Sequence, residues 1–333
     1  MTPTSSKRAL SHLCNQKVPV FLWGPPGIGK SSIVAQIAKE QKIDFIDLRL
    51  SLLDPTDLRG IPFFDASNHQ AIWAPASFLP DGTKKEGILF LDELNSAAPM
   101  VQASAYQLIL DRKIGEYTLP EGWAIVAAGN RESDRGVVYR MPAPLANRFV
   151  HLEMESNLQD WREWALKSNI DSSIISYIGY RPDALFEFDT TKESHAFATP
   201  RSWAYVSQIL ASKPEPDIVM PMITGAIGEE LAASYLGFRE VAESLPNIDD
   251  ILEGKEVIIP QEHAALHILT TAIVQRTKAH ASAQTLAHIV DFSLQIPAEF
   301  AIMIERDLKA RDIDLQRANN WGKWVRTFNH LTR

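Results

Sequence analysis

The sequence has little of what disulfide-bonded and membrane-spanning proteins depend on. Its single cysteine, Cys14, excludes an internal disulfide, and we expect it to be a buried or inert thiol. No apolar run approaches the roughly twenty residues that a helix needs to cross a bilayer. The first eight residues contain no apolar signal region. We therefore expect a cytoplasmic protein with no membrane insertion.

An excess of basic residues is also lacking. The formal net charge is −8, and the Lys and Arg residues are interleaved with acidic ones along the chain. Non-specific binding to nucleic acids draws on clustered Lys and Arg side chains. The charge therefore argues against a nucleic-acid partner.

The most informative stretch is a glycine-rich sequence near the N-terminus. GPPGIGKS, residues 24–31, matches G-x-x-x-x-G-K-[ST] in full, between a strand-like segment at 18–23 and a helix-like segment at 32–39. In such a loop, backbone N–H groups and the helix N-terminus surround phosphates, the lysine reaches the β- and γ-phosphates, and the hydroxyl binds Mg²⁺. The sequence therefore predicts a site for a nucleoside triphosphate, made by Gly24, Pro25, Pro26, Gly27, Ile28, Gly29, Lys30, Ser31 and Ser32.

Two later apolar segments end in polar side chains. Residues 86–93, EGILFLDE, are typical of a buried parallel strand whose carboxyl end faces a ligand. We assign Asp92, with Ser31, to Mg²⁺, and Glu93 to orienting and deprotonating the attacking water. A further apolar run at 123–128 leads to Asn130, whose amide we expect at the water or the γ-phosphate, with capping of the next turn as the alternative. Hydrolysis is therefore expected in addition to binding.

The order of these motifs resembles a known family. GPPGIGKS, LFLDE and AAGN are followed by PLANRF at 144–149 and ATPR at 198–201. This order is similar to Walker A, Walker B, sensor 1, arginine finger and sensor 2 of the MoxR family of AAA+ ATPases, and it spans about residues 8 to 210. The resemblance implies catalytic roles for Arg148 as the arginine finger and Arg201 as sensor 2. Other arginines of the same stretch remain alternatives for the finger: Arg131, Arg135 and Arg140.

The resemblance implies ATP and Mg²⁺ as cofactors and a ring, expected to be a hexamer, that hydrolyses ATP at subunit interfaces. The implied role is chaperone-like remodelling or activation of a protein partner, such as a separate von Willebrand factor A domain protein. Two other functions stay open: an ATP-dependent nucleic-acid motor and a slow nucleotide-regulated switch. The chain has no N-K-x-D motif for reading guanine, which favours ATP over GTP.

Length and patterning predict three parts. An α/β core, a parallel sheet with helices on both faces, is expected over residues 1–155, and the resemblance implies that it is a P-loop AAA+ core. Helical periodicity predicts helices over 156–212, with Trp161 and Trp164 on a shared face, and the resemblance implies that they form a lid. A helical C-terminal extension is expected over 213–333, after the proline-containing break at 213–216. In the extension we expect helices over 222–241, 263–281 and 283–292.

Two segments rich in aromatic residues predict hairpins. Residues 53–80 resemble the helix 2 insert of this AAA+ branch, and residues 112–123 the insert before sensor 1. We expect Phe64 and Tyr117 to pack under their own hairpins, with contact to a partner as the alternative. His263 and His267 lie one helical turn apart without a third ligand at a telling spacing, so we expect helix-surface histidines rather than a metal site.

Overall fold

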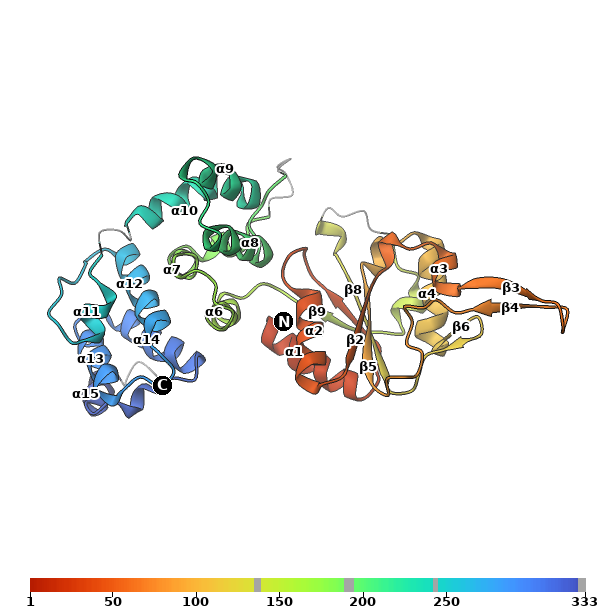
Figure 1. Cartoon of the computed structure of the whole chain (residues 1–333), viewed down its shortest axis with the longest axis horizontal. Coiled ribbons are helices and arrows are strands. Elements are labelled where there is room, and N and C mark those ends of the chain that lie inside the picture. The colour runs from red at the N-terminus through yellow and green to blue at the C-terminus, as the bar shows by residue number, and fades with distance from the viewer. Residues whose placement is uncertain (135–138, 189–194, 242–244, 329–333) are drawn as a thin grey trace. The chain divides into compact units, whose positions relative to one another are not determined.

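The computed structural model describes residues 1–134, 139–188, 195–241 and 245–328 (Figure 1). The chain divides into two compact units, residues 1–156 and 157–333. One hydrophobic cluster of the second unit includes residues from both sides of position 212, such as Trp203 and Tyr235, whose ring centroids lie 5.5 Å apart. The predicted division into a lid and an extension at that position remains a proposal.

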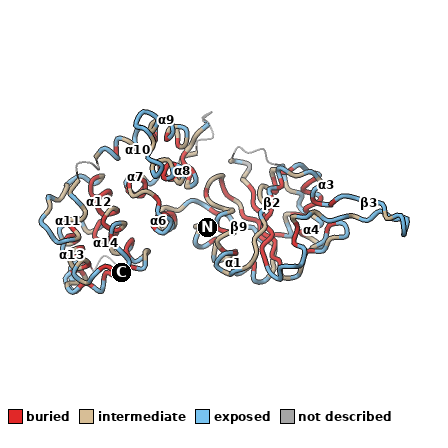
Figure 2. Tube along the Cα trace, in the orientation of Figure 1, coloured by how far each residue is buried: buried red, intermediate tan, exposed pale blue. Residues whose placement is uncertain are grey.

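The first unit is built around a parallel sheet of five strands. Its order is β2-β5-β8-β1-β9, and every neighbouring pair is parallel. The strands are β1 (Val20–Trp23), β2 (Asp44–Arg49), β5 (Gly87–Asp92), β8 (Trp123–Gly129) and β9 (Val150–Glu153). The central strands β5 and β8 are covered on both faces, which explains why their sequences are continuous apolar runs (Figure 2). The predicted α/β class of the core is confirmed.

Helices cover this sheet through apolar faces. One cluster joins Phe21 and Leu91 of the strands to Leu108 of α4 and Leu145 of α5. The helices α1 and α2 contact the sheet at β8, and their buried residues include Leu10 and Val34. The helices of the unit are α1 (Pro3–Asn15), α2 (Lys30–Gln41), α3 (Pro55–Arg59), α4 (Pro99–Asp111) and α5 (Ala143–Ala146).

Two antiparallel hairpins occur where inserts were expected. Strands β3 (Ile61–Asp65) and β4 (Gln70–Ala74) form a ribbon that extends away from the sheet (Figure 1). The prediction that Phe64 packs under this hairpin is wrong, because Phe64 is 72% exposed and a two-stranded ribbon has no second layer to cover it. In the shorter hairpin of β6 (Lys113–Ile114) and β7 (Tyr117–Thr118), Tyr117 is half-buried. Its hydroxyl donates at 2.7 Å to Pro80 O, which belongs to the first insert and not to its own hairpin.

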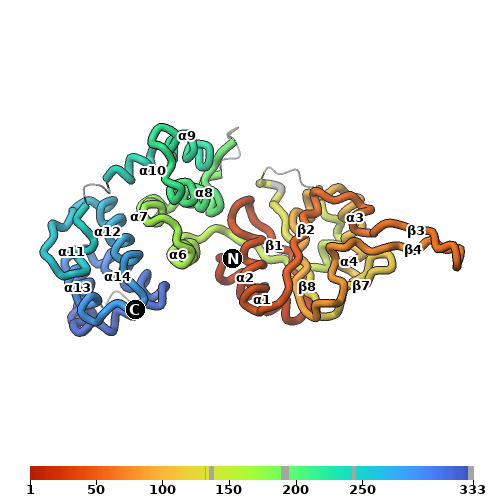
Figure 3. The backbone as a smooth tube through the Cα atoms, viewed as in Figure 1, coloured from red at the N-terminus to blue at the C-terminus, as the bar shows by residue number. Residues whose placement is uncertain are grey.

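The second unit is helical in all its named elements, and Figure 3 follows its backbone from α6 in green to α14 in blue. Helix α12 packs against α7 and α14. The Arg162 Nε of α6 donates to Asp307 Oδ2 of α14 at 2.7 Å, and both side chains are almost fully buried. The helices are α6 (Leu158–Lys167), α7 (Ser172–Tyr180), α8 (Pro200–Ala211), α9 (Pro216–Ile227), α10 (Glu229–Val241), α11 (Ile248–Leu252), α12 (His263–Arg276), α13 (Ala283–Ser293), α14 (Ala298–Ala310) and α15 (Trp321–Phe328).

Three helical predictions for this unit need correction. The helix expected over 222–241 is interrupted at Gly228, whose φ of +89° is left-handed and ends α9. Helix α12 ends at Arg276 and not at 281, and Thr277 adopts an extended conformation. Trp164 is 36% exposed, whereas Trp161 is buried, because the buried face of α6 is shared with the ion-paired Arg162.

No helix in the described parts of the chain combines the length and apolar character that a membrane span requires.

Candidate active site

The phosphate loop, residues 24–29, connects β1 to α2. Strand β1 ends at Trp23, Gly29 adopts a left-handed φ of +95°, and α2 begins at Lys30. No side chain among the described residues caps the N-terminus of α2. The helix dipole favours negative charge at this end, so the start of α2 is suited to an anion.

Lys30 connects the loop to the tip of β8. Its Nζ donates to Gly24 O at 2.6 Å, to Pro25 O at 3.0 Å and to the Asn130 Oδ1 at 3.0 Å. Strands β1 and β8 are neighbours in the sheet, and both run toward this edge. The lysine and the amide that the sequence assigned to one site therefore do lie together.

Asp92 is the last residue of β5, at the same edge of the sheet. Its Oδ1 accepts a hydrogen bond from Glu93 N at 2.9 Å. Burial raises the pKa of Asp92, and the neighbouring charge of Glu93 raises it as well. A partly buried carboxylate gains from a nearby cation, and carboxylate and hydroxyl oxygens are the hard ligands that Mg²⁺ prefers. The pair predicted to bind magnesium, Asp92 and Ser31, has suitable chemistry for the ion.

Glu93 is held by residues that the sequence interpretation missed. Its backbone is left-handed with a φ of +56°, and its carboxylate accepts a hydrogen bond from the Ser51 hydroxyl. The Arg49 Nε lies 3.7 Å from Glu93 Oε1. Arg49 ends β2 and is aligned with Asp92 in the adjacent strand. The available signal was the alternation of Asp47 and Arg49, which places polar side chains on one face of β2. Ser51 lies beyond the strand, in the 3₁₀ turn Leu50–Leu52, and had no such signal.

Asn95 is a second residue that the sequence interpretation missed. It is 3% exposed and lies two positions after Glu93, in the 3₁₀ turn Leu94–Ser96. Its Nδ2 donates to Asn130 O at 2.7 Å. The turn that follows β5 is therefore bonded to the residue that follows β8.

The candidate arginines differ in their surroundings. Arg131 N donates to Asp134 Oδ2 at 2.8 Å, and Arg131 is half-buried. Arg140 and Arg148 are exposed, the latter just after α5, while Arg135 lies outside the described residues. Arg201 is exposed in the first turn of α8, in the helical unit. The catalytic roles given to these arginines remain predictions.

Comparison with known proteins identifies the first unit. Residues 20–154 match the sequence profile of a family described as "ATPase family associated with various cellular activities (AAA)". The chain carries an AAA ATPase domain. This match covers the phosphate loop and every other predicted site residue except Arg201, and it supports nucleotide binding and ATP hydrolysis in general.

More specific likenesses are distant. Midasin from Giardia intestinalis is 26% identical over 185 residues, which make up 53% of this chain and only 4% of that protein. The RuvB Holliday junction branch migration motor of Thermotoga maritima is 18% identical, with a TM-score of 0.42 over 75% of this chain and 74% of the other. NtrX from Brucella abortus, in complex with ADP, is 12% identical, with a TM-score of 0.41 over 98% of this chain and 68% of the other. The assignment of the AAA domain therefore depends on the family match, and membership of the MoxR family remains a prediction.

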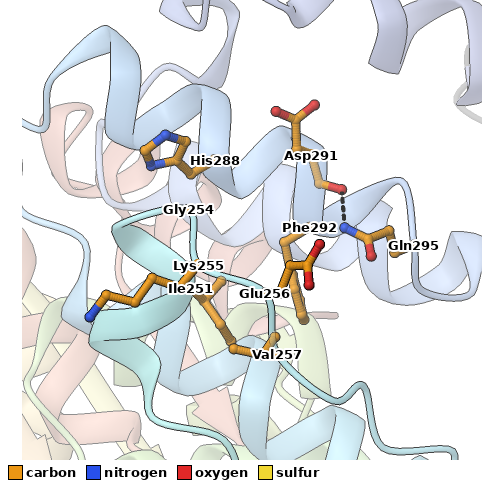
Figure 4. Close-up of a pocket in the computed structure, with 9 residues that line it drawn as sticks. All are labelled: Ile251, Gly254, Lys255, Glu256, Val257, His288, Asp291, Phe292 and Gln295. Atoms are coloured by element: carbon orange, nitrogen blue, oxygen red, sulfur yellow. Dashed lines mark hydrogen bonds between the residues drawn. The ribbon is translucent and has the colours of Figure 1, made fainter.

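Outside the AAA domain, a pocket opens between α11 and α13 (Figure 4). Two of its polar side chains have partners: Lys255 pairs with Asp250 and Glu253 at 2.8 Å, and His288 Nδ1 lies 2.9 Å from Leu252 O. Its lining residues are Ile251, Gly254, Lys255, Glu256, Val257, His288, Asp291, Phe292 and Gln295.

The two histidines belong to the helical unit, and the cysteine to α1. His263 Nδ1 is 3.6 Å from Glu299 Oε1, and burial lowers the pKa of His267 to about 4. Nowhere in the described residues do three His, Cys, Asp or Glu side chains gather around a possible metal position. Cys14 is buried as predicted, and burial raises its pKa to about 11.

Proposed function

We propose that the AAA domain binds ATP with Mg²⁺ and hydrolyses it, with Glu93 as the general base. The observation that carries this proposal is the meeting of three strand ends at one edge of the sheet. Lys30 follows the loop after β1, Asp92 ends β5 with Glu93 directly after it, and Asn130 follows β8. The Lys30 Nζ lies 3.0 Å from Asn130 Oδ1. Cationic, acidic and amide groups are the set that phosphoryl transfer requires.

The roles of these side chains follow from their positions. The N–H groups at the start of α2 and the Lys30 ammonium receive the phosphates, with Lys30 giving up its bonds to the loop carbonyls. Ser31 and Asp92 hold Mg²⁺, which neutralises charge on the phosphate oxygens. Glu93, oriented by Ser51 and Arg49, accepts a proton from the attacking water, and the Asn130 amide orients that water or the γ-phosphate.

We further propose that the chain assembles into a ring, expected to be a hexamer, in which Arg148 reaches the nucleotide of a neighbouring subunit. The exposure of Arg148 supports this role, because a guanidinium supplied in trans must be accessible. We also propose the sensor 2 role for Arg201, which lies in the first turn of α8. Hydrolysis would then remodel or activate a protein partner, such as a von Willebrand factor A domain protein. The exposed Phe63 and Phe64 of the β3–β4 hairpin support a protein partner.

The experiment that tests hydrolysis compares Glu93→Gln with the parent chain. The variant should bind ATP and lose about a hundredfold or more in kcat, because a general base typically contributes 10²–10⁴-fold. The matched control is Glu86→Gln, just before the opposite end of β5, which should hydrolyse ATP normally. Near-normal turnover by Glu93→Gln would refute its assigned role. Stimulation of the parent chain by DNA or RNA alone would replace the protein-remodelling role with that of a nucleic-acid motor.

A further inference from the structure

Asn95 makes contacts that are difficult to explain by stability alone. Its side chain is almost fully buried, and its Nδ2 donates to Asn130 O at 2.7 Å. Its Oδ1 is also buried, yet has no hydrogen-bond partner among the described residues. A buried acceptor without a partner costs free energy, so an apolar side chain here would avoid that cost. The hydrogen bond from Nδ2 to Asn130 O is therefore the interaction that explains an amide at this buried position.

The surroundings of Asn95 leave its amide little freedom. A Cβ atom built on Gly129 would lie 2.1 Å from Asn95 Oδ1, so the last residue of β8 packs directly against the amide. The backbone of Asn95 makes a second connection, because Tyr139 N donates to Asn95 O at 2.7 Å. Asn95 thus contacts the backbone at Gly129 and Asn130, where the chain leaves β8, and at Tyr139 nearer α5.

We propose that Asn95 is a positioning residue for hydrolysis, which acts by fixing the backbone of Asn130. With the Asn130 carbonyl bonded to Asn95, the Asn130 side chain is held where it meets Lys30. This inference rests on the proposed function, in which the Asn130 amide orients the attacking water or the γ-phosphate. Asn95 follows Glu93 by two residues. One short turn therefore positions both the general base, Glu93, and the residue that holds the backbone of Asn130.

The expected effect is on kcat rather than on nucleotide affinity. The loop and Lys30 make the ground-state contacts with the phosphates, whereas the position of the Asn130 amide matters most in the transition state. Misplacement of a catalytic group by about 1 Å can cost roughly a hundredfold in rate. We expect Asn95→Ala to lower kcat by about tenfold to a hundredfold and to leave KM for ATP nearly unchanged.

The matched control is Gln102→Ala. Gln102 is also 3% exposed, and its amide Nε2 donates at 3.0 Å to a backbone carbonyl just before its own helix, Ala97 O. Both substitutions remove a buried amide, so both should lower the denaturation midpoint, but only Asn95→Ala should lower kcat. If Asn95→Ala folds poorly, Asn95→Asp takes its place in the test. It keeps the side-chain shape while replacing the donor, and it should also lower kcat.

A double substitution separates this inference from the proposed function. Asn130→Ala keeps its backbone carbonyl but loses the amide, so adding Asn95→Ala should lower kcat little further if Asn95 acts through Asn130. Fully additive losses, or an Asn95→Ala enzyme as active as Gln102→Ala, would overturn the role of Asn95 while leaving the proposed function intact. Normal turnover by Asn130→Ala would instead overturn the role of Asn130 and, with it, the inference.

Discussion

The Lys30 ammonium lies 3.0 Å from the Asn130 side-chain oxygen, although 100 residues separate the two in the sequence. The contact forms because β1 and β8 are adjacent parallel strands whose carboxyl ends meet at one edge. The same lysine donates to Gly24 O and Pro25 O, both in the phosphate loop. The ammonium thus contacts both the phosphate loop and the residue that follows β8.

Replacement of this lysine should weaken nucleotide binding. We expect Lys30→Ala to lose about tenfold or more in ATP affinity, because hydrogen bonds to charged groups contribute roughly 1.5–3 kcal/mol. Titration with a fluorescent ATP analogue measures the loss. Lys39→Ala, in the exposed last turn of α2, controls for the loss of a positive charge from the same helix and should bind normally. Equal affinity of the two variants would contradict the assignment.

Arg148 provides a test of assembly. Arg148→Ala should bind ATP normally but hydrolyse it poorly, because an arginine finger stabilises the transition state far more than the ground state. Mixing it with Lys30→Ala protein should restore some activity, since a mixed ring contains interfaces with one intact Lys30 and one intact Arg148.

The mixing experiment also separates the alternative arginines. If subunits exchange and the mixture is no more active than its parts, Arg148 acts in cis or the finger is a different residue. The same assay with alanine at the other candidates would then identify it: Arg131, Arg135 or Arg140.

The buried ion pair Arg162–Asp307 should contribute to the stability of the helical unit. Asp307→Asn leaves the Arg162 charge buried without its counterion, and breaking such a pair typically costs about 3–5 kcal/mol. Urea unfolding, followed by a probe in the helical unit, measures the change. The exposed pair Arg276–Asp249 is the control, and Asp249→Asn should cost far less because solvent screens that pair. Similar losses for both variants would contradict this prediction.

His267 should make the stability of the helical unit depend on pH. Burial, followed by the charge of Arg162, lowers its pKa from 6.5 to about 4, so the folded state favours the neutral imidazole. The stabilisation is therefore fully present above pH 6.5 and is lost as the pH falls toward 4. Denaturation midpoints at several pH values should fall less steeply for His267→Leu than for the parent chain. The variant His263→Gln, at the exposed neighbour, should follow the parent chain.

The sequence predicted the parts of the site that are local in the chain. The phosphate loop is one continuous motif. Asp92, Glu93 and Asn130 each come at or just after the end of an apolar run that the sequence pattern predicts to be a strand. Arg49, Ser51 and Asn95 were missed because their roles depend on which segments become neighbours. Nothing in the chain order states that β2 lies beside β5, yet this pairing aligns Arg49 with Asp92 and brings it near Glu93.

In the helical unit, periodicity predicted positions of helices better than their limits or buried faces. Gly228 and Trp164 illustrate the two failures. A single left-handed residue divides an otherwise continuous helical pattern, and a pattern of apolar residues cannot reveal that the charged Arg162 is buried against a carboxylate 145 residues away. On α6, the ion pair formed in the tertiary structure determines that Arg162 is buried.

The burial of Cys14 has a practical consequence for spectroscopy. It is the single cysteine of the chain, and a pKa of about 11 leaves few thiolates at neutral pH to react with maleimides. A new surface thiol, introduced by Phe64→Cys at the exposed hairpin, would therefore be labelled selectively without removal of the native cysteine. A fluorophore attached there would report on whatever approaches the hairpin during turnover.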